Sequence, residues 1–114
     1  MSVVRLTQFT DPHLYGKESE CLRGVPTLPA LTQAIAHARA RDWPPDAVLV
    51  TGDLVQDDPA GYPHFRREFG ALGLPVLCLP GNHDEPRFAP GLFPRQAPGP
   101  IQSTIGTCLI GTCR

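Results

Sequence analysis

The sequence has little of several features that would mark particular classes of protein. No apolar run approaches the roughly 20 residues that cross a bilayer, and the first nine residues are too short and too interrupted for a signal peptide. The formal net charge is only −1 over 114 residues, so electrostatic binding to nucleic acid or to an anionic membrane is not expected. These features favour a soluble, cytoplasmic protein.

Cysteine is sparse and proline is unevenly placed. No two of the four cysteines are spaced as C-x-x-C, and the closest pair, Cys108 and Cys113, has no histidine near it in sequence, so we expect reduced thiols rather than a zinc site. Nine of the 14 prolines lie between Pro59 and Pro100. A 41% apolar fraction is enough for one small domain with a core, and residues 86–100 are predicted to be an irregular loop.

The first part of the chain predicts a strand followed by a helix. Residues 3–9 are β-rich and lead into a turn signal, which indicates a strand and then a loop. Apolar residues next recur at helical spacing and predict an amphipathic helix over 28–41 (Leu28, Leu31, Ile35 and Ala38). Thr27 is the expected N-cap of this helix, and Pro29 is tolerated in its first turn.

Two more strands and a second helix follow. The short apolar run at 47–50 is typical of a central parallel strand that is buried on both faces. Asp58 is the expected N-cap of a helix over 59–72, and residues 75–79 repeat the buried-strand pattern. This alternation predicts an α/β fold, a βαβαβ unit with a parallel sheet and right-handed crossovers. Residues 101–114 hold two short β-prone pieces.

Polar clusters come directly after each of the three predicted strands. Because parallel strands end at the same edge of a sheet, where open α/β sheets bind ligands, these clusters are expected to converge. They contain carboxylates, an amide and imidazoles, but no serine or cysteine that would serve as a nucleophile, and no G-x-G-x-x-G motif follows a strand. The clusters are Asp11-Pro12-His13, Gly52-Asp53-Leu54 and Gly81-Asn82-His83-Asp84.

Oxygen and imidazole donors of this kind suit hard or borderline divalent cations. In an extended segment Asp11 and His13 would point to the same side and could hold one ion together. Asp53 could bridge that ion to a second one, which Asn82 would bind through its amide oxygen. Two such ions activate water and stabilise both oxygens of a displacement at phosphorus.

Each cluster has an alternative interpretation when it is taken alone. Asp-Pro-His is commonly a loop, Gly-Asp after a strand is commonly a turn in which the aspartate caps backbone N–H groups, and Gly-Asn-His-Asp fits an Asx-type turn. Three such turns would then have to coincide at one edge of one sheet. The combination therefore favours a metal site.

The order and spacing of these clusters resemble the calcineurin-like metallophosphoesterases, whose pattern runs D-x-H, G-D and G-N-H-D/E. The stretches Val-Leu-Val-Thr-Gly-Asp-Leu-Val-Gln-Asp (48–57) and Leu-Pro-Gly-Asn-His-Asp (79–84) are most similar to the bacterial class III cyclic-nucleotide phosphodiesterase branch. The resemblance covers residues 4–90. It implies a metal-dependent phosphodiester hydrolase that acts on a 3',5'-cyclic nucleotide such as cyclic AMP.

The resemblance also implies a role for each matching residue. Asp11 and His13 would bind the first metal, Asp53 would bridge two metals, and Asn82 would bind the second metal and contact the substrate phosphate. His83 would face the phosphate, stabilising its charge or protonating the leaving oxygen, and Asp84 would orient His83. The two divalent metals of this branch are usually iron or manganese.

The sequence departs from the family pattern in its histidines. Family members carry further metal-binding histidines in a second half, including a G-H-x-H motif, whereas this chain has four histidines in all. His37 and His64 fall in the predicted helices and are expected to be solvated. We therefore interpret residues 1–114 as a partial phosphoesterase domain, with the motifs in 4–90 and an irregular tail over 91–114.

Three functions remain open on these grounds: the N-terminal half of a cyclic-nucleotide phosphodiesterase, a metal-binding remnant without catalytic competence, and an α/β interaction module without a metal. The sequence predicts a small phosphodiester as partner, no nucleic acid or membrane, and self-association through the incomplete sheet. The ligand-type clusters favour the first two functions over the third.

Overall fold

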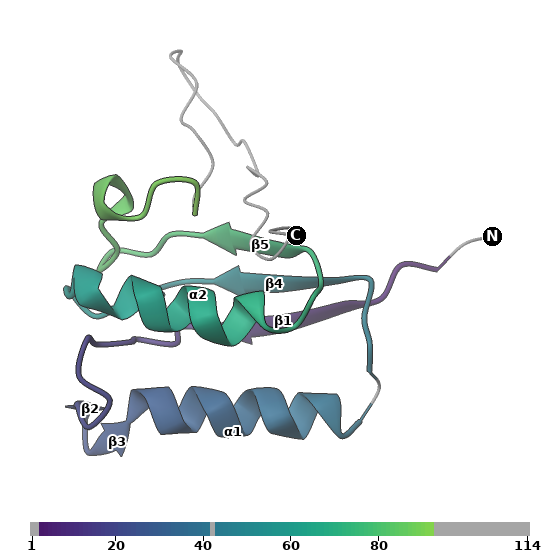
Figure 1. Ribbon diagram of the computed structural model, residues 1–114, viewed down its shortest axis with the longest axis horizontal. Helices are drawn as coiled ribbons and strands as arrows, with labels where there is room; N and C mark the ends of the chain where they lie inside the picture. Colours follow the sequence, from purple (N-terminus) through teal and green to yellow (C-terminus); the bar gives the residue numbers. More distant parts are fainter. Residues whose placement is uncertain (1–2, 42, 93–114) are drawn as a thin grey trace, which may run out of the picture.

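A computed structural model describes residues 3–41 and 43–92 of the chain. Its centre is a parallel sheet of three strands in the order β1-β4-β5 (Figure 1). These strands are β1 (Leu6–Thr10), β4 (Ala47–Thr51) and β5 (Val76–Leu79). In register, Phe9 of β1 lies beside Val50 of β4, which lies beside Cys78 of β5. The predicted α/β fold class is confirmed.

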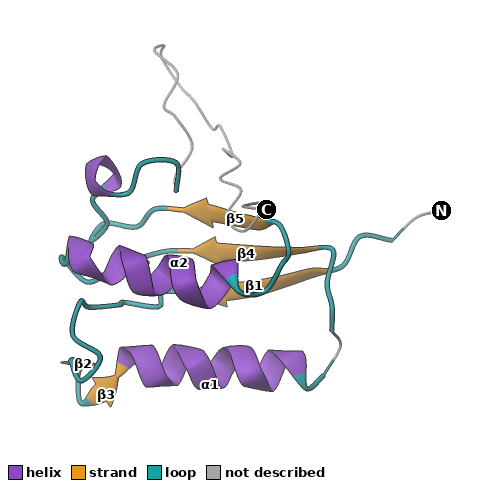
Figure 2. Ribbon diagram, viewed as in Figure 1, coloured by secondary structure: helices purple, strands orange, loops and turns teal. Residues whose placement is uncertain are grey.

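Helices connect the strands (Figure 2). The connection from β1 to β4 contains a small antiparallel hairpin, β2 (Cys21–Leu22) and β3 (Val25–Pro26), and the helix α1 (Thr27–Arg39). The connection from β4 to β5 contains a 3-10 turn, η1 (Pro59–Gly61), which runs directly into α2 (Tyr62–Gly70). A second 3-10 turn, η2 (Pro86–Phe88), follows β5. None of the described helices is long and apolar enough to cross a membrane.

The elements lie where the sequence patterns predict them, but several boundaries differ. The helix predicted over 28–41 ends at Arg39, and the helix predicted over 59–72 is the 3-10 turn η1 followed by α2, which ends at Gly70. Asp58 caps η1 as expected, because its side chain accepts a hydrogen bond from Ala60 N at 3.1 Å. Thr27, by contrast, is already the first residue of α1; Pro26 occupies the N-cap position and provides no side-chain cap. The first strand begins at Leu6 rather than at residue 3, and Val3 is exposed. The central and third strands lie where the apolar runs predicted them.

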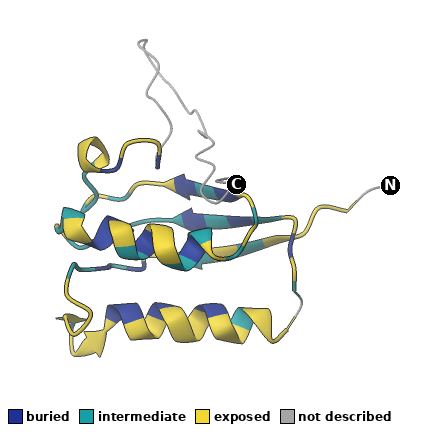
Figure 3. Ribbon diagram, in the orientation of Figure 1, coloured by how far each residue is buried: buried dark blue, intermediate teal, exposed yellow. Residues whose placement is uncertain are grey.

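Both helices pack on the same face of the sheet. The apolar stripe of α1 joins Val48, Val50 and Cys78 in one core, and the side of α1 that faces the sheet is its buried side (Figure 3). The aromatic residues of α2 extend this core, and the Phe69 ring meets the Phe9 ring of β1 edge-on at 5.5 Å between centroids. Because all three strands pair in parallel, their carboxyl ends lie at one edge of the sheet.

The opposite face of the sheet is much less buried, so the expectation that the central strand is buried on both faces is wrong. Burial alternates along β4, where Val48 and Val50 are buried while Leu49 is only half-buried. Within the described residues, the strand at 47–50 is therefore buried on one face only, since no described helix lies over its second face. The predicted strand pieces within 101–114, together with Cys108 and Cys113, lie outside the described residues. Cys21 and Cys78 are not joined in a disulfide.

Candidate metal centre

The loops after β1 and β4 run side by side beyond the end of the sheet. Asp11 N donates to Thr51 O at 2.9 Å, His13 N to Asp53 O at 3.0 Å and Leu14 N to Leu54 O at 2.9 Å. An isolated parallel bridge then pairs Leu14 with Val55. The first two polar clusters are therefore held together by a ladder that continues the parallel sheet.

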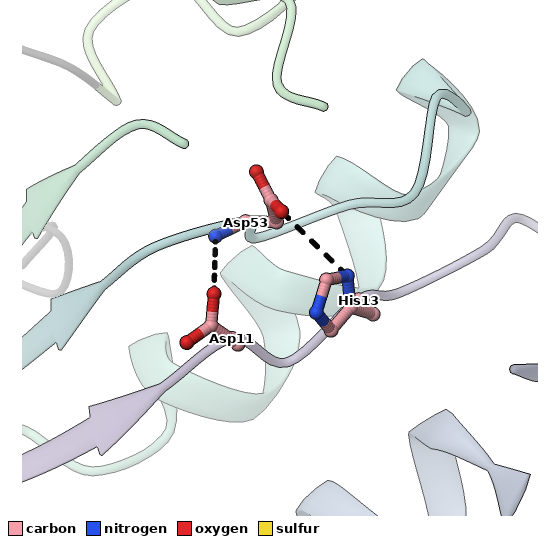
Figure 4. Close-up of side chains that lie close together, drawn as sticks. All are labelled: Asp11, His13 and Asp53. Carbon is pink, nitrogen blue, oxygen red and sulfur yellow. Dashed lines mark hydrogen bonds and ion pairs between the residues drawn. The ribbon is translucent and has the colours of Figure 1, made fainter. Parts of the chain in front are cut away.

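This ladder gathers the side chains of Asp11, His13 and Asp53. One ligand atom from each of the three lies within 4.8 Å of the others. His13 Nδ1 is 3.9 Å from Asp53 Oδ2, and Asp53 N donates to Asp11 Oδ1 at 3.1 Å (Figure 4). Two carboxylates and an imidazole fit a divalent cation, so the sequence-predicted residues form a potential metal-binding group.

The route by which Asp11 and His13 converge differs from the one we expected. Their segment is not extended, because φ is +51° at Asp11 and +48° at His13. A left-handed backbone is uncommon for residues other than glycine and costs about 1–3 kcal/mol each. The ladder to the β4 loop holds both residues in this conformation, so tertiary hydrogen bonds set their geometry.

Two glycines allow the carboxylates to approach the backbone closely. Gly52 has φ +85°, and a Cβ there would lie only 2.6 Å from Asp11 Cγ. A Cβ at Gly81 would lie 2.6 Å from the backbone N of Asp53. A larger residue at either position would push an aspartate away from its place in the cluster.

The loop after β5 lies against the same cluster. His83 N donates a hydrogen bond to Asp53 Oδ1 at 2.8 Å. Asn82 is exposed, one residue before this contact. The third predicted cluster thus contributes to the site by fixing the Asp53 carboxylate through the backbone.

Asp84 does not pair with His83 in the hydrogen bonds of the described residues, which differs from the expected role. Its carboxylate instead accepts hydrogen bonds from the backbone N–H groups of Leu54, Val55 and Gly81, at 2.8–3.2 Å. It also accepts one from the Tyr62 hydroxyl at 3.0 Å. Asp84 therefore ties the loop after β5 to the loop after β4.

Tyr62 completes this link from α2. Its hydroxyl donates to Asp84 and accepts a hydrogen bond from Glu85 N at 2.8 Å. The side chain is almost fully buried. Burial, aided by the negative charge of Asp84, raises the pKa of Tyr62 far above its ordinary value.

Two residues beside the site were not singled out from the sequence. Gln56 Oε1 lies 2.7 Å from His13 Nδ1, and the Asp57 carboxylate lies 2.9 Å from His83 Nδ1. Both follow Asp53 within four positions, in the stretch Gly-Asp-Leu-Val-Gln-Asp. The sequence signals that could have found them are the polar residues that follow Asp53 and the family resemblance of the stretch 48–57, which contains both.

The remaining two histidines lie away from the cluster. His37 is exposed on α1, as expected. His64 is only half-buried rather than fully solvated, and its Nε2 lies 2.8 Å from the carbonyl oxygen of Gly16. That contact joins α2 to the loop after β1.

A groove of about 570 Å³ lies beside the cluster, between β1 and α1. Asp11 and His13 line one end of it. The β2–β3 hairpin contributes Leu22, Arg23 and Val25 to its wall. A small organic molecule bound there would therefore be adjacent to two of the three clustered side chains.

The fold and the cluster together define an α/β protein with a potential Asp-His-Asp metal site at the carboxyl edge of its parallel sheet. The sequence profile of the calcineurin-like phosphoesterases matches residues 4–107, which is most of the chain. The chain therefore belongs to the calcineurin-like phosphoesterase family, and the resemblance seen in its motifs is confirmed.

Within this family, the chain is similar to several relatives named as cyclic-nucleotide phosphodiesterases. The chain is 40% identical over 89 residues to the 3',5'-cyclic adenosine monophosphate phosphodiesterase CpdA of Haemophilus influenzae, and 36% identical over 91 residues to CpdA of Escherichia coli. These alignments cover 76% and 79% of the chain but 32% of each relative. A probable cyclic nucleotide phosphodiesterase of a Synechococcus species is 37% identical over 82 residues, which is 71% of the chain and 31% of the relative. The chain thus spans about a third of the length of these relatives.

Proposed function

We propose that this chain is the N-terminal, metal-binding part of a phosphodiesterase that hydrolyses a 3',5'-cyclic nucleotide, with cyclic AMP as the first candidate. The observation that carries the proposal is the cluster of Asp11, His13 and Asp53 at the carboxyl edge of the sheet. Similarity to relatives named as cyclic AMP phosphodiesterases supports the substrate class. The cytoplasm, predicted from the sequence, is the proposed location.

Each residue of the cluster has a distinct place in this proposal. Asp11 and His13 would hold a first divalent cation, iron or manganese, and Asp53 would be shared with a second cation that Asn82 also binds. Metal ions of this kind activate water and stabilise charge on the oxygens of phosphorus. The fixed position of Asp53 supports its shared role, because Asp11 and His13 from the loop after β1 and His83 from the loop after β5 all contact this residue.

His83 is proposed to contact the substrate phosphate. Its backbone N–H is tied to Asp53, and its ring Nδ1 is held by the Asp57 carboxylate, so the ring is kept at the border of the cluster. A positioned imidazole can donate a hydrogen bond to a charged phosphate or protonate a leaving oxygen. Asp84 supports this arrangement because its carboxylate accepts hydrogen bonds from the backbone N–H groups of Val55 and Gly81 and so joins the loops after β4 and β5.

Elemental analysis and Mn²⁺ titration test the metal assignment. In a chain that holds both cations, we expect Asp53→Asn to weaken binding at both positions, because one carboxylate serves both cations, and Asn82→Ala to weaken only the second. Glu20→Gln is the matched control, since it makes the same charge change at an exposed residue outside the cluster. Equal losses of bound metal in Asp53→Asn and Asn82→Ala would contradict the shared role of Asp53.

A metal-binding protein without catalytic activity is the second candidate. It is favoured by the ligand count, because the described residues form one cluster of three His and Asp ligands, and a second cation would have only the shared Asp53 and the neutral Asn82. We therefore expect the 114-residue polypeptide to bind at most one cation, weakly, and to show little hydrolysis of an aryl phosphodiester in added Mn²⁺. Robust turnover by a monomer of these residues would overturn that expectation.

A further inference from the structure

His13 and His83, the two histidines at the metal centre, are each held through the Nδ1 atom of the ring. His13 Nδ1 lies 2.7 Å from Gln56 Oε1, and His83 Nδ1 lies 2.9 and 3.0 Å from the two oxygens of Asp57. A carbonyl or carboxylate oxygen can only accept a hydrogen bond, so the proton must sit on each Nδ1. Gln56 Nε2, at 3.5 Å from His83 Nδ1, is too distant to compete with Asp57.

The backbone places these two acceptors where they are needed. Gln56 N donates to Leu14 O at 3.0 Å, which sets Gln56 opposite the loop that carries His13. Asp57 N donates to His83 O at 3.2 Å, so Asp57 hydrogen-bonds to His83 through both its main chain and its side chain. Asp57 has φ +53°. With the backbone left-handed at this residue, the Gln56 side chain contacts His13 and the Asp57 side chain contacts His83.

We propose that Gln56 and Asp57 are positioning residues that fix the ring tautomers of His13 and His83. With the proton held on Nδ1, the Nε2 atom of His13 has a free lone pair for a metal ion. In the same way, the Nε2 atom of His83 faces away from its carboxylate partner and is left for a phosphate oxygen. A histidine that binds metal through one ring nitrogen commonly donates the other N–H to a carbonyl or carboxylate, which orients the ring.

This inference rests on the proposed function for the use of each Nε2 atom, but the tautomers themselves are measurable without any metal. Two-bond ¹H–¹⁵N NMR spectra of the metal-free 114-residue chain report which ring nitrogen carries the proton. We expect a protonated Nδ1 on both His13 and His83. A bare Nδ1 on either ring would overturn the assignment for that histidine.

His64 provides an internal reference in the same spectrum. Its Nε2 lies 2.8 Å from the carbonyl oxygen of Gly16, so we expect the opposite tautomer, with the proton on Nε2. His37 is exposed and is expected to show the mixture typical of a free imidazole. Signals are assigned by substituting each histidine with glutamine in turn. A His64 signal unchanged in a variant also shows that α2 and the loop after β1 are still packed.

Substitutions at the two positioning residues separate their effects. Gln56→Leu removes the acceptor for His13, and we expect His13 alone to become a tautomer mixture while Mn²⁺ affinity falls about 10- to 100-fold. Gln56→Glu retains a side-chain oxygen acceptor and should restore the Nδ1-protonated ring. Asp57→Ala should change the tautomer of His83 alone and leave Mn²⁺ affinity within about twofold of the unaltered chain.

The outcomes distinguish the inference from the proposed function. If the chain binds Mn²⁺ but His13 carries a bare Nδ1, the role of Gln56 is wrong while the metal site stands. If both rings are protonated on Nδ1 but no Mn²⁺ binds, the positioning contacts are supported and the metal site is wrong. If Gln56→Leu shifts the tautomer of His13 without changing Mn²⁺ affinity, the inferred link from Gln56 to the metal is overturned.

Discussion

At the scale of single residues, two glycines leave the space that the carboxylates of the metal cluster occupy. Asp11 packs directly over Gly52, and Asp53 packs over Gly81. Gly52 also needs a left-handed backbone, at φ +85°. The absence of a side chain at this position therefore serves two purposes, conformational freedom and space for the Asp11 carboxylate.

Substitution of Gly52 by alanine separates those two purposes. Gly52→Ala should destabilise the fold by about 1–3 kcal/mol through the left-handed backbone and should also lower Mn²⁺ affinity at least tenfold, because its Cβ displaces Asp11. Gly24→Ala is the matched control, since Gly24 has φ +81° and no atom within 4 Å of an added Cβ. Urea unfolding of both variants measures the loss of stability, and Mn²⁺ titration measures the loss of affinity. Equal Mn²⁺ affinity in the two variants would show that Asp11 is not displaced.

Tyr62 gives the fold a pH dependence that a single substitution should remove. Its pKa is raised by burial, so the folded chain keeps the hydroxyl proton at a pH where the unfolded chain, with an ordinary value of about 10, has lost it. The stabilisation is complete below about pH 10 and is lost as the pH rises through the raised pKa, with a slope of at most about 1.4 kcal/mol per pH unit.

Urea unfolding between pH 8 and about pH 11.5 measures this effect. We expect the free energy of unfolding to fall above about pH 10 in the unaltered chain and to fall less steeply in Tyr62→Phe. Tyr15→Phe, which removes the other tyrosine hydroxyl, should retain the steep fall. An identical pH profile for the two variants would contradict the assignment to Tyr62.

At the scale of secondary-structure elements, the entry to α2 depends on Asp58. Its Oδ1 caps η1 through Ala60 N at 3.1 Å, and its Oδ2 accepts from Gly16 N at 2.8 Å. One carboxylate thus satisfies the start of a helical segment and anchors the loop after β1, while Pro59 needs no hydrogen-bond acceptor for its own nitrogen.

Removal of the cap should be measurable by unfolding. Asp58→Ala is expected to lower the free energy of unfolding by about 2 kcal/mol, since it loses a helix cap and a second backbone hydrogen bond. Asp58→Asn keeps an oxygen that can cap Ala60 N and should recover about half of the loss. Thermal or urea unfolding compares the two. A loss in Asp58→Asn as large as that in Asp58→Ala would argue that charge, rather than the cap, is the stabilising feature.

At the scale of the whole molecule, the sheet has one packed face and one partly apolar face that no described helix covers. Leu49 of β4 and Leu77 of β5 are register partners on this second face, and Leu6 and Leu79 at its margins are 53% and 36% exposed. Apolar faces of this kind favour association, and a single β-sheet layer with one covered face is marginally stable.

We expect the 114-residue polypeptide to self-associate through this face. The double variant Leu49→Thr and Leu77→Thr replaces leucine with β-branched threonine, which favours strands, and removes the apolar contact. It should therefore shift the chain towards monomer in sedimentation or size-exclusion experiments. Val25→Thr, at an exposed position of the β2–β3 hairpin, is the control and should leave association unchanged. Association that persists in the double variant would place the contact elsewhere.

The local elements were predictable because they depend on neighbouring residues. The apolar spacing behind Thr27 and the runs at 47–50 and 75–79 place each element within a few residues of its observed bounds. The helix start was one residue off because Thr27 adopts helical geometry itself instead of capping. The second face of the central strand could not be predicted, since burial depends on which elements lie over the sheet.

The parallel α/β order and the identity of the clustered side chains could be predicted from the sequence, because strand periodicity, helix spacing and the three motifs are properties of short segments. The way in which those side chains are held depends on contacts between distant segments. The left-handed backbones of Asp11 and His13 come from a ladder to another loop. The hydrogen bond from His83 to Asp57 spans 26 positions, and the one from Leu54 N to Asp84 spans 30. Contacts at such separations arise from the packing of whole elements, and a linear pattern of residue types does not encode them.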